Sequence, residues 1–193
     1  MPDSRNSVDG ELLTRFRAGD REAFTLIYRM YSPAVFRFSL HMSCDHIKAT
    51  ETTQDVFVWL VHHPDGFDPS RGELGAFLIG VARKFLLRLW RNERRQLARR
   101  IPLDEAEAGV DSVGWSGTTE AESQVARLRE FVAALPARYR EVVVLCDLEG
   151  HTYEAAAGVL ECAVGTVRSR LHRARELLAR KLQAVKETQG CSV

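Results

Sequence analysis

The chain has 193 residues, of which 45% are hydrophobic, and its 27 Lys and Arg nearly balance its 26 Asp and Glu. This composition excludes a disordered acidic or basic tail protein, and the length fits one domain or two small ones. No run of about 18 apolar residues is present and the first ten residues lack an apolar signal core. We therefore expect a cytoplasmic protein with no membrane insertion.

The first predicted domain, residues 8–97, begins with apolar residues at helical spacing. They cover residues 12–16 and 23–31 and are interrupted by the turn-forming pair Gly19-Asp20. Ser32-Pro33 then provides a helix start, because serine caps helices and proline suits their first position. The pattern therefore predicts that a separate helix begins at this pair and runs through Leu40.

Residues 48–62 form the next predicted helix, with an inner face of Val56, Phe57, Leu60 and Val61. Glu51, Gln54 and Asp55 lie at i, i+3 and i+4, so they share one polar face. Such a face is either simply hydrated or meets a partner.

A loop of turn formers, residues 65–72, leads into a long predicted helix over residues 74–95. The inner side of this helix is predicted to carry Phe77, Leu78, Val81, Phe85 and Leu89. Residues 83–100 hold eight basic side chains against one acid, Glu93. An exposed aromatic loop beside a basic helix suits single-stranded nucleic acid, since extruded bases stack and phosphates need cations.

The next segment is acidic and rich in Gly, Ser and Thr. Residues 101–122 carry six acids and no base, and their few apolar residues have no sustained period. We therefore predict a flexible acidic linker over residues 98–120. The predicted fold is all-α, with two small helical domains joined by this linker.

The second predicted domain, residues 121–182, is expected to contain four helices. Thr119-x-x-Glu122 is a capping box, and the helix after it ends before Pro136 with the apolar series Val125, Leu128, Val132 and Leu135. A second helix runs from Pro136 toward Gly150, and Thr152 caps a third, Tyr153 to Leu160. A longer basic helix begins near Val164. A short helix, a tight turn and a longer basic helix are typical of a helix-turn-helix.

The last helix separates apolar from basic residues. At 100° per residue, Val167, Leu171, Ala174 and Leu178 fall on one stripe. Arg168, Ser169, His172 and Arg173 project from the other side, with Arg170 and Arg175 on the flanks. A single basic patch is often only a hydrated face, but two patches in two domains favour one long polyanion. We therefore predict DNA binding in the major groove.

Cysteine spacing gives no disulfide framework or zinc motif. Cys44, Cys146, Cys162 and Cys191 form no CxxC pair, so reduced thiols are expected. His41, Cys44 and His46 lie near one another in sequence, but their spacing matches no standard metal site. No metal or cofactor is predicted, and whether these residues or Cys191 have a redox or metal role stays open.

These motifs resemble a known family. The strings Tyr153–Leu160 and Val164–Arg175 resemble region 4 of bacterial extracytoplasmic-function (ECF) sigma factors of the sigma-70 family, and Gly165–Arg175 is the most specific part. Four further strings resemble region 2 of the same family, namely Gly19-Asp20-x-x-Ala23-Phe24, Gln54-Asp55-Val56-Phe57, Phe67-Asp68-Pro69 and Leu78-x-x-Val81-Ala82-Arg83. The resemblance covers nearly the whole chain in the family's order.

The resemblance implies a role for each patch. Residues matching those that read the double-stranded −35 element are Thr166, Arg168, Ser169, Arg170, His172, Arg173 and Arg175. Residues matching the part that captures the single-stranded −10 element are Phe67, Asp68, Arg71, Phe77, Arg83, Lys84, Arg88 and Arg91. Glu51, Gln54 and Asp55 match the face that docks on core RNA polymerase.

The implied partners are RNA polymerase core, through the clamp helices of its largest subunit and the flap of its second-largest, promoter DNA, and an anti-sigma factor. Several positions depart from the family pattern, namely Thr52, Phe77, Lys84, Arg88, Ala155 and Glu161. Glu161 stands where a turn glycine is usual, which predicts a strained or altered turn. Lys84 replaces an asparagine and can only donate hydrogen bonds, which changes the base preference expected there.

The sequence therefore favours a sigma factor without chemistry of its own, since it holds no metal triad, phosphate-cradling loop or nucleophile-base pair. The alternative is a stand-alone helix-turn-helix regulator whose first domain senses a ligand or dimerises. That alternative needs neither the polar face of residues 48–62 nor the basic helix at 83–100. An enzyme acting on nucleic acid is a third possibility and lacks a recognisable acid, base or metal constellation.

Overall fold

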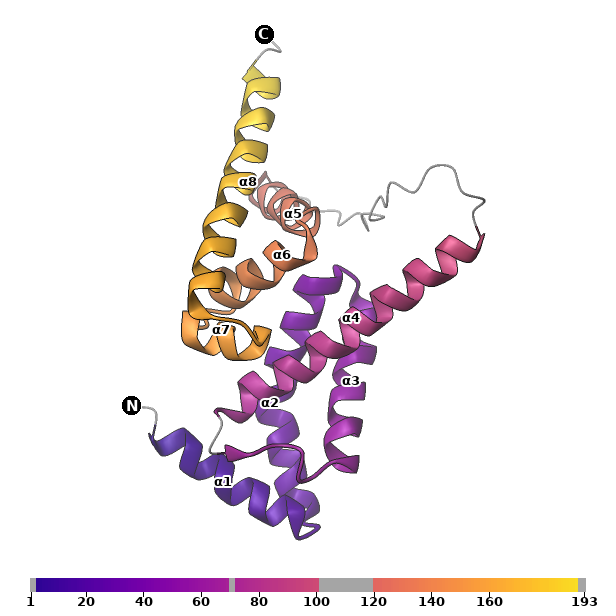
Figure 1. The fold of residues 1–193 in the computed structure, drawn as a ribbon, viewed down its shortest axis with the longest axis vertical. Helices are drawn as coiled ribbons and strands as arrows, with labels where there is room; N and C mark the ends of the chain where they lie inside the picture. The colour runs from indigo at the N-terminus through magenta and orange to yellow at the C-terminus, as the bar shows by residue number, and fades with distance from the viewer. Residues whose placement is uncertain (1–2, 70–71, 101–119, 191–193) are drawn as a thin grey trace. The chain divides into compact units, whose positions relative to one another are not determined.

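The computed structural model describes the backbone of residues 3–69, 72–100 and 120–190, and the side chains of residues 8–69, 72–96 and 127–183. Every regular secondary-structure element in these ranges is a helix, as predicted (Figure 1). The chain divides into two compact units, Met1–Ala106 (unit 1) and Glu107–Val193 (unit 2). The domain limits expected from the sequence stay a prediction, and the linker residues 101–119 lie outside the described residues.

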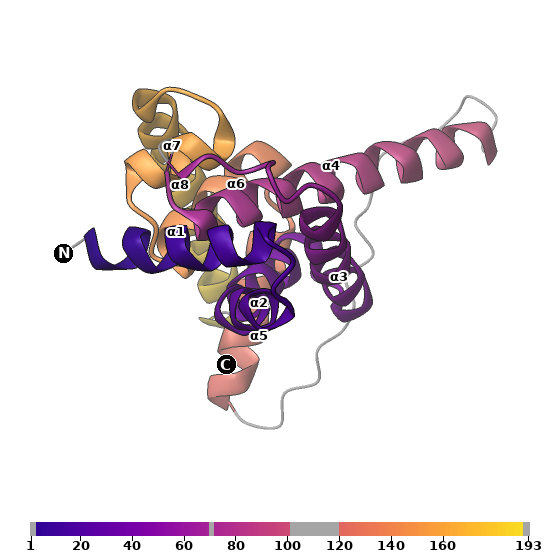
Figure 2. The ribbon, with the colours of Figure 1, turned by 90° about the horizontal axis from the view of Figure 1, so that it is seen from below.

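Unit 1 packs four helices, α1 (Asp3–Arg17), α2 (Arg21–Ser43), α3 (His46–His62) and α4 (Leu74–Arg100). α2 lies at the centre, because it contacts each of the other three. The C-terminal half of α4 projects past the other helices of the unit (Figure 2). The core is formed by side chains from all four helices, among them Leu13, Ile27, Phe38, Leu60 and Leu78.

α2 is one helix where the sequence predicts two. Pro33 lies inside it, and the expected helix start at Ser32 is wrong. A proline within a helix removes a hydrogen bond and costs about 3 kcal/mol. Burial outweighs this cost, because Ala23, Ile27 and Val35 lie on one continuous stripe that only an unbroken helix can present to the core.

Two aspartates fix the helix starts in unit 1. The Asp20 carboxylate accepts from the backbone N–H groups of Glu22 and Ala23 at 2.8 and 3.3 Å. A hydrogen bond from Arg15, together with these backbone bonds, lowers the pKa of the Asp20 carboxyl. Asp45 caps α3 in the same way, so that helix begins at His46, two residues before the predicted start.

The buried face of α4 differs from the prediction. The buried side chains are Leu74, Leu78, Ile79, Ala82 and Leu86, whereas Phe77, Val81, Phe85 and Leu89 are only half-buried. At 100° per residue the observed face is rotated by roughly 70° from the predicted one. α4 packs against both α2 and α3, and this double contact sets the face. On α3, Val61 is exposed rather than directed inward.

Unit 2 comprises α5 (Glu120–Ala133), α6 (Ala137–Val143), a π-helical turn η2 (Val144–Leu148), α7 (Tyr153–Leu160) and α8 (Val164–Gly190). Leu135, Val142, Leu145 and Leu160 are buried, but Leu128 is exposed, contrary to the predicted apolar series. The buried Arg140 donates to the carbonyl oxygens of Ala133 and Leu135 and so caps the end of α5. No helix in the described ranges combines the length and apolarity needed to cross a membrane.

Candidate nucleic-acid interface

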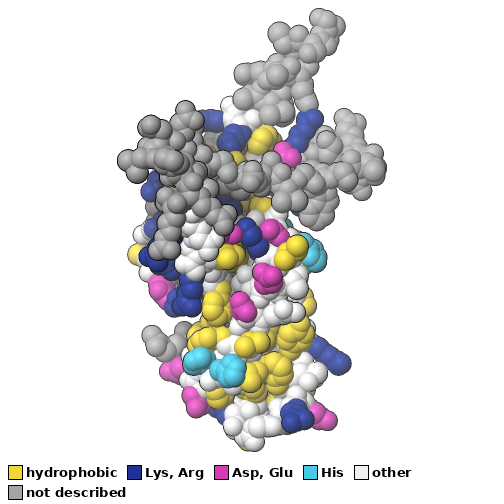
Figure 3. Space-filling model, turned by 90° about the vertical axis from the view of Figure 1, so that its right-hand side faces the viewer, with side chains coloured by type: hydrophobic (Ala, Val, Ile, Leu, Met, Phe, Trp, Pro, Cys, Tyr) yellow, Lys and Arg dark blue, Asp and Glu magenta, His cyan; other side chains and the backbone are white. Residues whose placement is uncertain are grey.

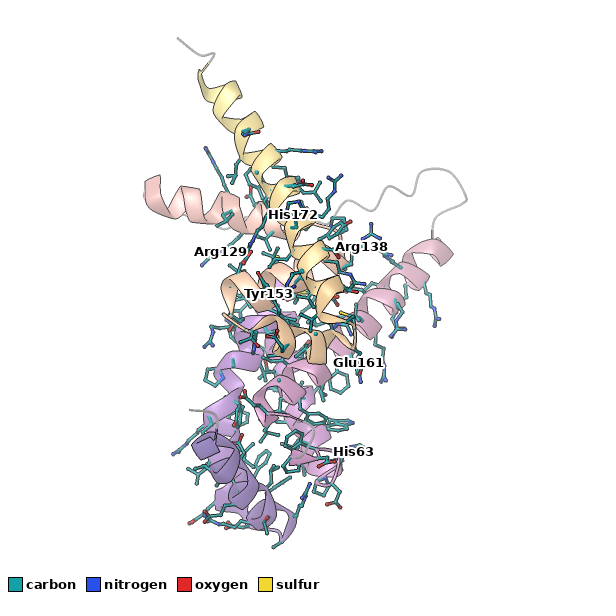
Figure 4. The ribbon with its side chains drawn as sticks, turned by 60° about the vertical axis from the view of Figure 1, so that its left-hand side comes forward. His63, Arg129, Arg138, Tyr153, Glu161 and His172 are labelled. Atoms are coloured by element: carbon teal, nitrogen blue, oxygen red, sulfur yellow. The ribbon has the colours of Figure 1, made fainter. Side chains whose placement is uncertain are left out.

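α7 and α8 form the predicted helix-turn-helix (Figure 4). Thr152 caps α7, and its hydroxyl accepts from the backbone N–H of Ala155 at 3.2 Å. α7 ends at Glu161, whose backbone is left-handed with φ 53° and ψ 45°. The backbone N–H of Cys162 returns to the Ala157 carbonyl oxygen at 3.1 Å, which closes the turn. Glu161 therefore occupies a conformation that glycine adopts more easily, as its place in the family pattern predicts.

The outer face of α8 carries the predicted DNA contacts. Val167, Leu171 and Ala174 are buried and hold the helix against the unit. The exposed residues on the opposite side are Arg168, Ser169, His172 and Arg173, while Thr166 and Arg170 are half-buried at the edges. This arrangement confirms the predicted separation of apolar and polar faces, except that Leu178 is only half-buried.

Acidic side chains engage part of this basic face. Arg173 Nη1 lies 2.6 Å from Glu176 Oε2, and His172 Nε2 lies 3.4 Å from Glu176 Oε1. The hydrogen bond from Arg173 is the main cause that lowers the pKa of the Glu176 carboxyl. Glu176 is not among the residues predicted to form contacts. It nevertheless follows Arg173 by three residues and His172 by four, a spacing at which side chains on a helix meet.

Arg175 is held differently from its neighbours. Its Nη2 and Nε donate to the two carboxylate oxygens of Asp147 in η2, at 2.5 and 3.1 Å. These hydrogen bonds raise the pKa of the Arg175 guanidinium. The bidentate pair ties α8 to η2, a contact across 28 residues that no local pattern reveals. Arg168 lies over the Tyr153 ring, 5.8 Å from its centroid, and so links α8 to the start of α7.

A second basic surface runs along α4. At 100° per residue, the exposed side chains of Lys84, Arg88 and Arg91 fall within an arc of about 60°, which also holds the half-buried Phe77 near the start of the helix. Arg88 lies 6.0 Å from the Phe85 ring centroid, and Arg91 Nε donates to the Leu87 carbonyl oxygen. Arg83 lies off this arc and is half-buried. The structure therefore brings three of the four predicted basic residues of α4 into one row.

The loop before α4 does not expose its aromatic residue. Phe67 is only 4% exposed and packs on Phe77, with ring centroids 5.1 Å apart. The expectation of an exposed Phe67 is therefore wrong, because the ring fills the space between the loop and α4. Asp68 is exposed, and Arg71 lies outside the described residues.

The same loop carries features that the sequence did not indicate. His63 stacks on Trp59 with ring centroids 4.6 Å apart, and a Cβ on Gly66 would lie 2.6 Å from the Trp59 ring. Arg17, at the end of α1, donates to the carbonyl oxygens of Pro64 and Phe67 at 3.1 and 2.7 Å. The loop is thus fixed from both sides.

α3 presents the third predicted surface. Glu51, Gln54 and Asp55 are exposed, as expected for a contact face. The apolar side chains of Ile47, Val58 and Val61 are also exposed, between 47 and 70%, and continue the same face at helical spacing. Figure 3 shows hydrophobic side chains gathered on the lower part of the side it presents. Thr52 is buried, so its departure from the family pattern concerns packing within unit 1 and not this face.

The cluster of His41, Cys44 and His46 has no metal-binding geometry. Within the described ranges, no three or more His, Cys, Asp or Glu side chains are placed to share an ion. Cys44 ends α2 in a left-handed conformation with φ 55°. Its thiol lies 3.8 Å from the His41 carbonyl oxygen. Cys191 lies outside the described residues.

Comparison with known proteins agrees with this geometry. Residues 27–96 match the family model of sigma-70 region 2, and residues 126–178 match that of sigma-70 region 4. The RNA polymerase sigma-H factor of Pseudomonas aeruginosa is 30% identical over 186 residues, which cover 91% of this chain and 94% of that protein.

Two further relatives extend the comparison. The ECF RNA polymerase sigma factor SigE of Mycolicibacterium smegmatis is 27% identical over 152 residues, which cover 79% of this chain but 58% of that longer protein. The sigma factor RpoE of Bartonella quintana, solved in complex with the anti-sigma factor NepR, superposes with a TM-score of 0.64 at 25% identity, over 83% of this chain and 96% of that one. The chain therefore belongs to the sigma-70 family, as an ECF RNA polymerase sigma factor.

Proposed function

We propose that this sigma factor divides promoter recognition between its two units, α8 of unit 2 binding the duplex −35 element and α4 of unit 1 binding the single-stranded −10 element. The observation that carries the proposal is that each unit presents its own basic helical face, within the residues that match regions 2 and 4. Two such faces on one chain suit two parts of a single polyanion.

The −35 contact rests on the outer face of α8. Arg168, Ser169, His172 and Arg173 are exposed there, and an arginine can donate two hydrogen bonds to guanine in the major groove. Thr166 and Arg170 are half-buried at the edges of this face, and we assign them to contacts with the DNA backbone. Arg175 is bound to Asp147, so we assign it a structural role in which it orients α8.

The −10 contact rests on the row of Lys84, Arg88 and Arg91 on α4, the helix that follows the loop holding Asp68. These cations can follow the phosphates of one strand. Phe67 and Phe77 pack on each other, so their contribution is to fix the loop against α4. Arg83 is half-buried beside the row, and Arg71 completes the proposed set from the loop.

We further propose that α3 docks on core RNA polymerase through Glu51, Gln54 and Asp55, with the clamp helices of the largest subunit as partner, and that unit 2 meets the flap of the second-largest subunit. An anti-sigma factor is a second proposed partner. The similar RpoE of Bartonella quintana was solved with such a protein, which supports this assignment. Covering the exposed apolar and acidic face of α3 would stop polymerase from binding there.

Two measurements test the proposal. The full-length chain is mixed with sigma-free core polymerase and passed over a gel-filtration column, and the complex is then used for run-off transcription on genomic fragments. We expect co-elution and new transcripts whose start sites define the promoter. Tight binding to an operator without polymerase, and no transcripts, would instead indicate a stand-alone regulator and refute the sigma assignment of these surfaces.

A further inference from the structure

Glu176 is the acidic residue within the basic part of α8. Residues 164–181 carry six Lys and Arg against this one acid. At 100° per residue Glu176 lies about 180° from the buried Val167, so it stands in the middle of the outer face. His172 and Arg173, two of the proposed DNA contacts, lie on either side of it.

Each of these two residues meets one oxygen of the Glu176 carboxylate. Arg173 Nη1 approaches Oε2 at 2.6 Å, and His172 Nε2 approaches Oε1 at 3.4 Å. The hydrogen bond from Arg173 is the main cause that lowers the pKa of this carboxyl. The side chain is 39% exposed, so the carboxylate also faces the solvent from which DNA would approach.

The ion pair with Glu176 uses only one of the three guanidinium nitrogens of Arg173. Glu176 engages Nη1, while Nη2 and Nε remain, and two parallel donors are what guanine needs in the major groove. An unrestrained arginine on such a face can contact a phosphate of any sequence, which adds affinity without selectivity. A fixed carboxylate beside it repels phosphates.

We propose that Glu176 is a positioning residue for −35 recognition, because it directs Arg173 to base edges and disfavours its contacts with phosphates. The inference rests on the proposed function of α8. Glu176 lowers the affinity of α8 for DNA in general and raises the ratio between promoter and non-promoter DNA. His172, on the second carboxylate oxygen, is held in the same arrangement.

The test uses holoenzyme assembled from core polymerase and the full-length chain, with promoter DNA and the same DNA carrying a scrambled −35 element. Glu176→Gln should reduce the ratio of the two affinities about two- to fivefold, the range open to an exposed ion pair. Most of the change should be a gain on scrambled DNA. There the slope of log affinity against log salt should steepen by about 0.9, which is one added phosphate contact.

Two controls separate this role from a general charge effect. Glu130→Gln removes the same charge from an exposed position on α5 and should leave the ratio unchanged. In an Arg173→Ala background, Glu176→Gln should no longer change the ratio of the two affinities, because the carboxylate sets that ratio through Arg173. Equal effects of the two glutamine variants, or an undiminished effect without Arg173, would overturn the inference. A wild-type holoenzyme that does not prefer the intact −35 element would instead refute the proposed function.

Discussion

Glu161 offers a direct test of how backbone strain is stored in the helix-turn-helix. Its φ of 53° places a residue with a Cβ in the left-handed region. That conformation costs an ordinary residue roughly 1–2 kcal/mol relative to its preferred regions, and glycine avoids most of this cost. Replacing Glu161 with glycine should therefore stabilise unit 2.

The magnitude follows from two opposing effects. Relief of the left-handed strain contributes about 1–2 kcal/mol. Against it, glycine makes the unfolded chain more flexible, which costs about 0.4–1 kcal/mol. The two backbone hydrogen bonds that close the turn, from the N–H groups of Glu161 and Cys162, are retained in the variant. We expect a net gain of about 1 kcal/mol, which corresponds to roughly 4–8 °C in the melting temperature of a unit of this size.

Scanning calorimetry of the full-length chain measures this shift. Glu161→Ala is the matched control, because it removes the side chain and its contacts but keeps the Cβ that causes the strain. The glycine variant should melt above the alanine variant by the stated amount. A glycine variant no more stable than the alanine variant would refute the argument that this turn stores strain.

Four further substitutions test other parts of the structure. Gly66→Ala should destabilise unit 1 by about 1–3 kcal/mol, since the added Cβ would overlap the Trp59 ring, and urea unfolding followed by tryptophan fluorescence measures the loss. Unchanged stability would show that Trp59 can move aside. Arg173→Ala should reduce discrimination at the −35 element by about 1–3 kcal/mol, measured by binding of holoenzyme to single-base variants. Arg175→Ala should leave that discrimination intact and cost unit 2 only about 0.5 kcal/mol of stability, because its pair with Asp147 is exposed; the reverse ranking would contradict their assigned roles. Asp55→Ala should weaken association with core polymerase while circular dichroism stays unchanged, and undiminished association would exclude this face of α3.

Local signals in the sequence located most helix ends. Asp20 and Thr152 accept hydrogen bonds from backbone N–H groups two or three residues ahead, and Gly150 adopts a left-handed φ of 71°, so short motifs suffice to identify all three. The helix-turn-helix was predictable for the same reason, because a pattern of a few neighbouring residues indicates both its turn and its buried stripe. Pro33 shows the limit of such signals. Its start-of-helix motif was overridden by burial along α2, which depends on residues far away in the chain.

The candidate site was predictable as a set of surfaces but not in its internal contacts. The positions of Arg173 and Arg175 on α8 follow from helical periodicity, whereas the pairing of Arg175 with Asp147 depends on how η2 packs. Phe67 was expected at the surface because its neighbours are turn formers. Its burial depends on Phe77 in α4, and only the tertiary structure brings the two rings together.

The contact between Arg17 and the loop before α4 has a consequence for how this surface can evolve. Both hydrogen bonds go to main-chain carbonyl oxygens, of Pro64 and Phe67, and so do not depend on which side chains those positions carry. Arg17 Nε also lies 3.1 Å from the Asp65 carboxylate, and this ion pair does depend on a side chain. Substitutions at exposed loop positions other than Asp65 therefore leave both main-chain hydrogen bonds in place. If the proposed −10 role of this loop holds, related regulators can acquire new promoter preferences by exchanging a few side chains on an unchanged backbone.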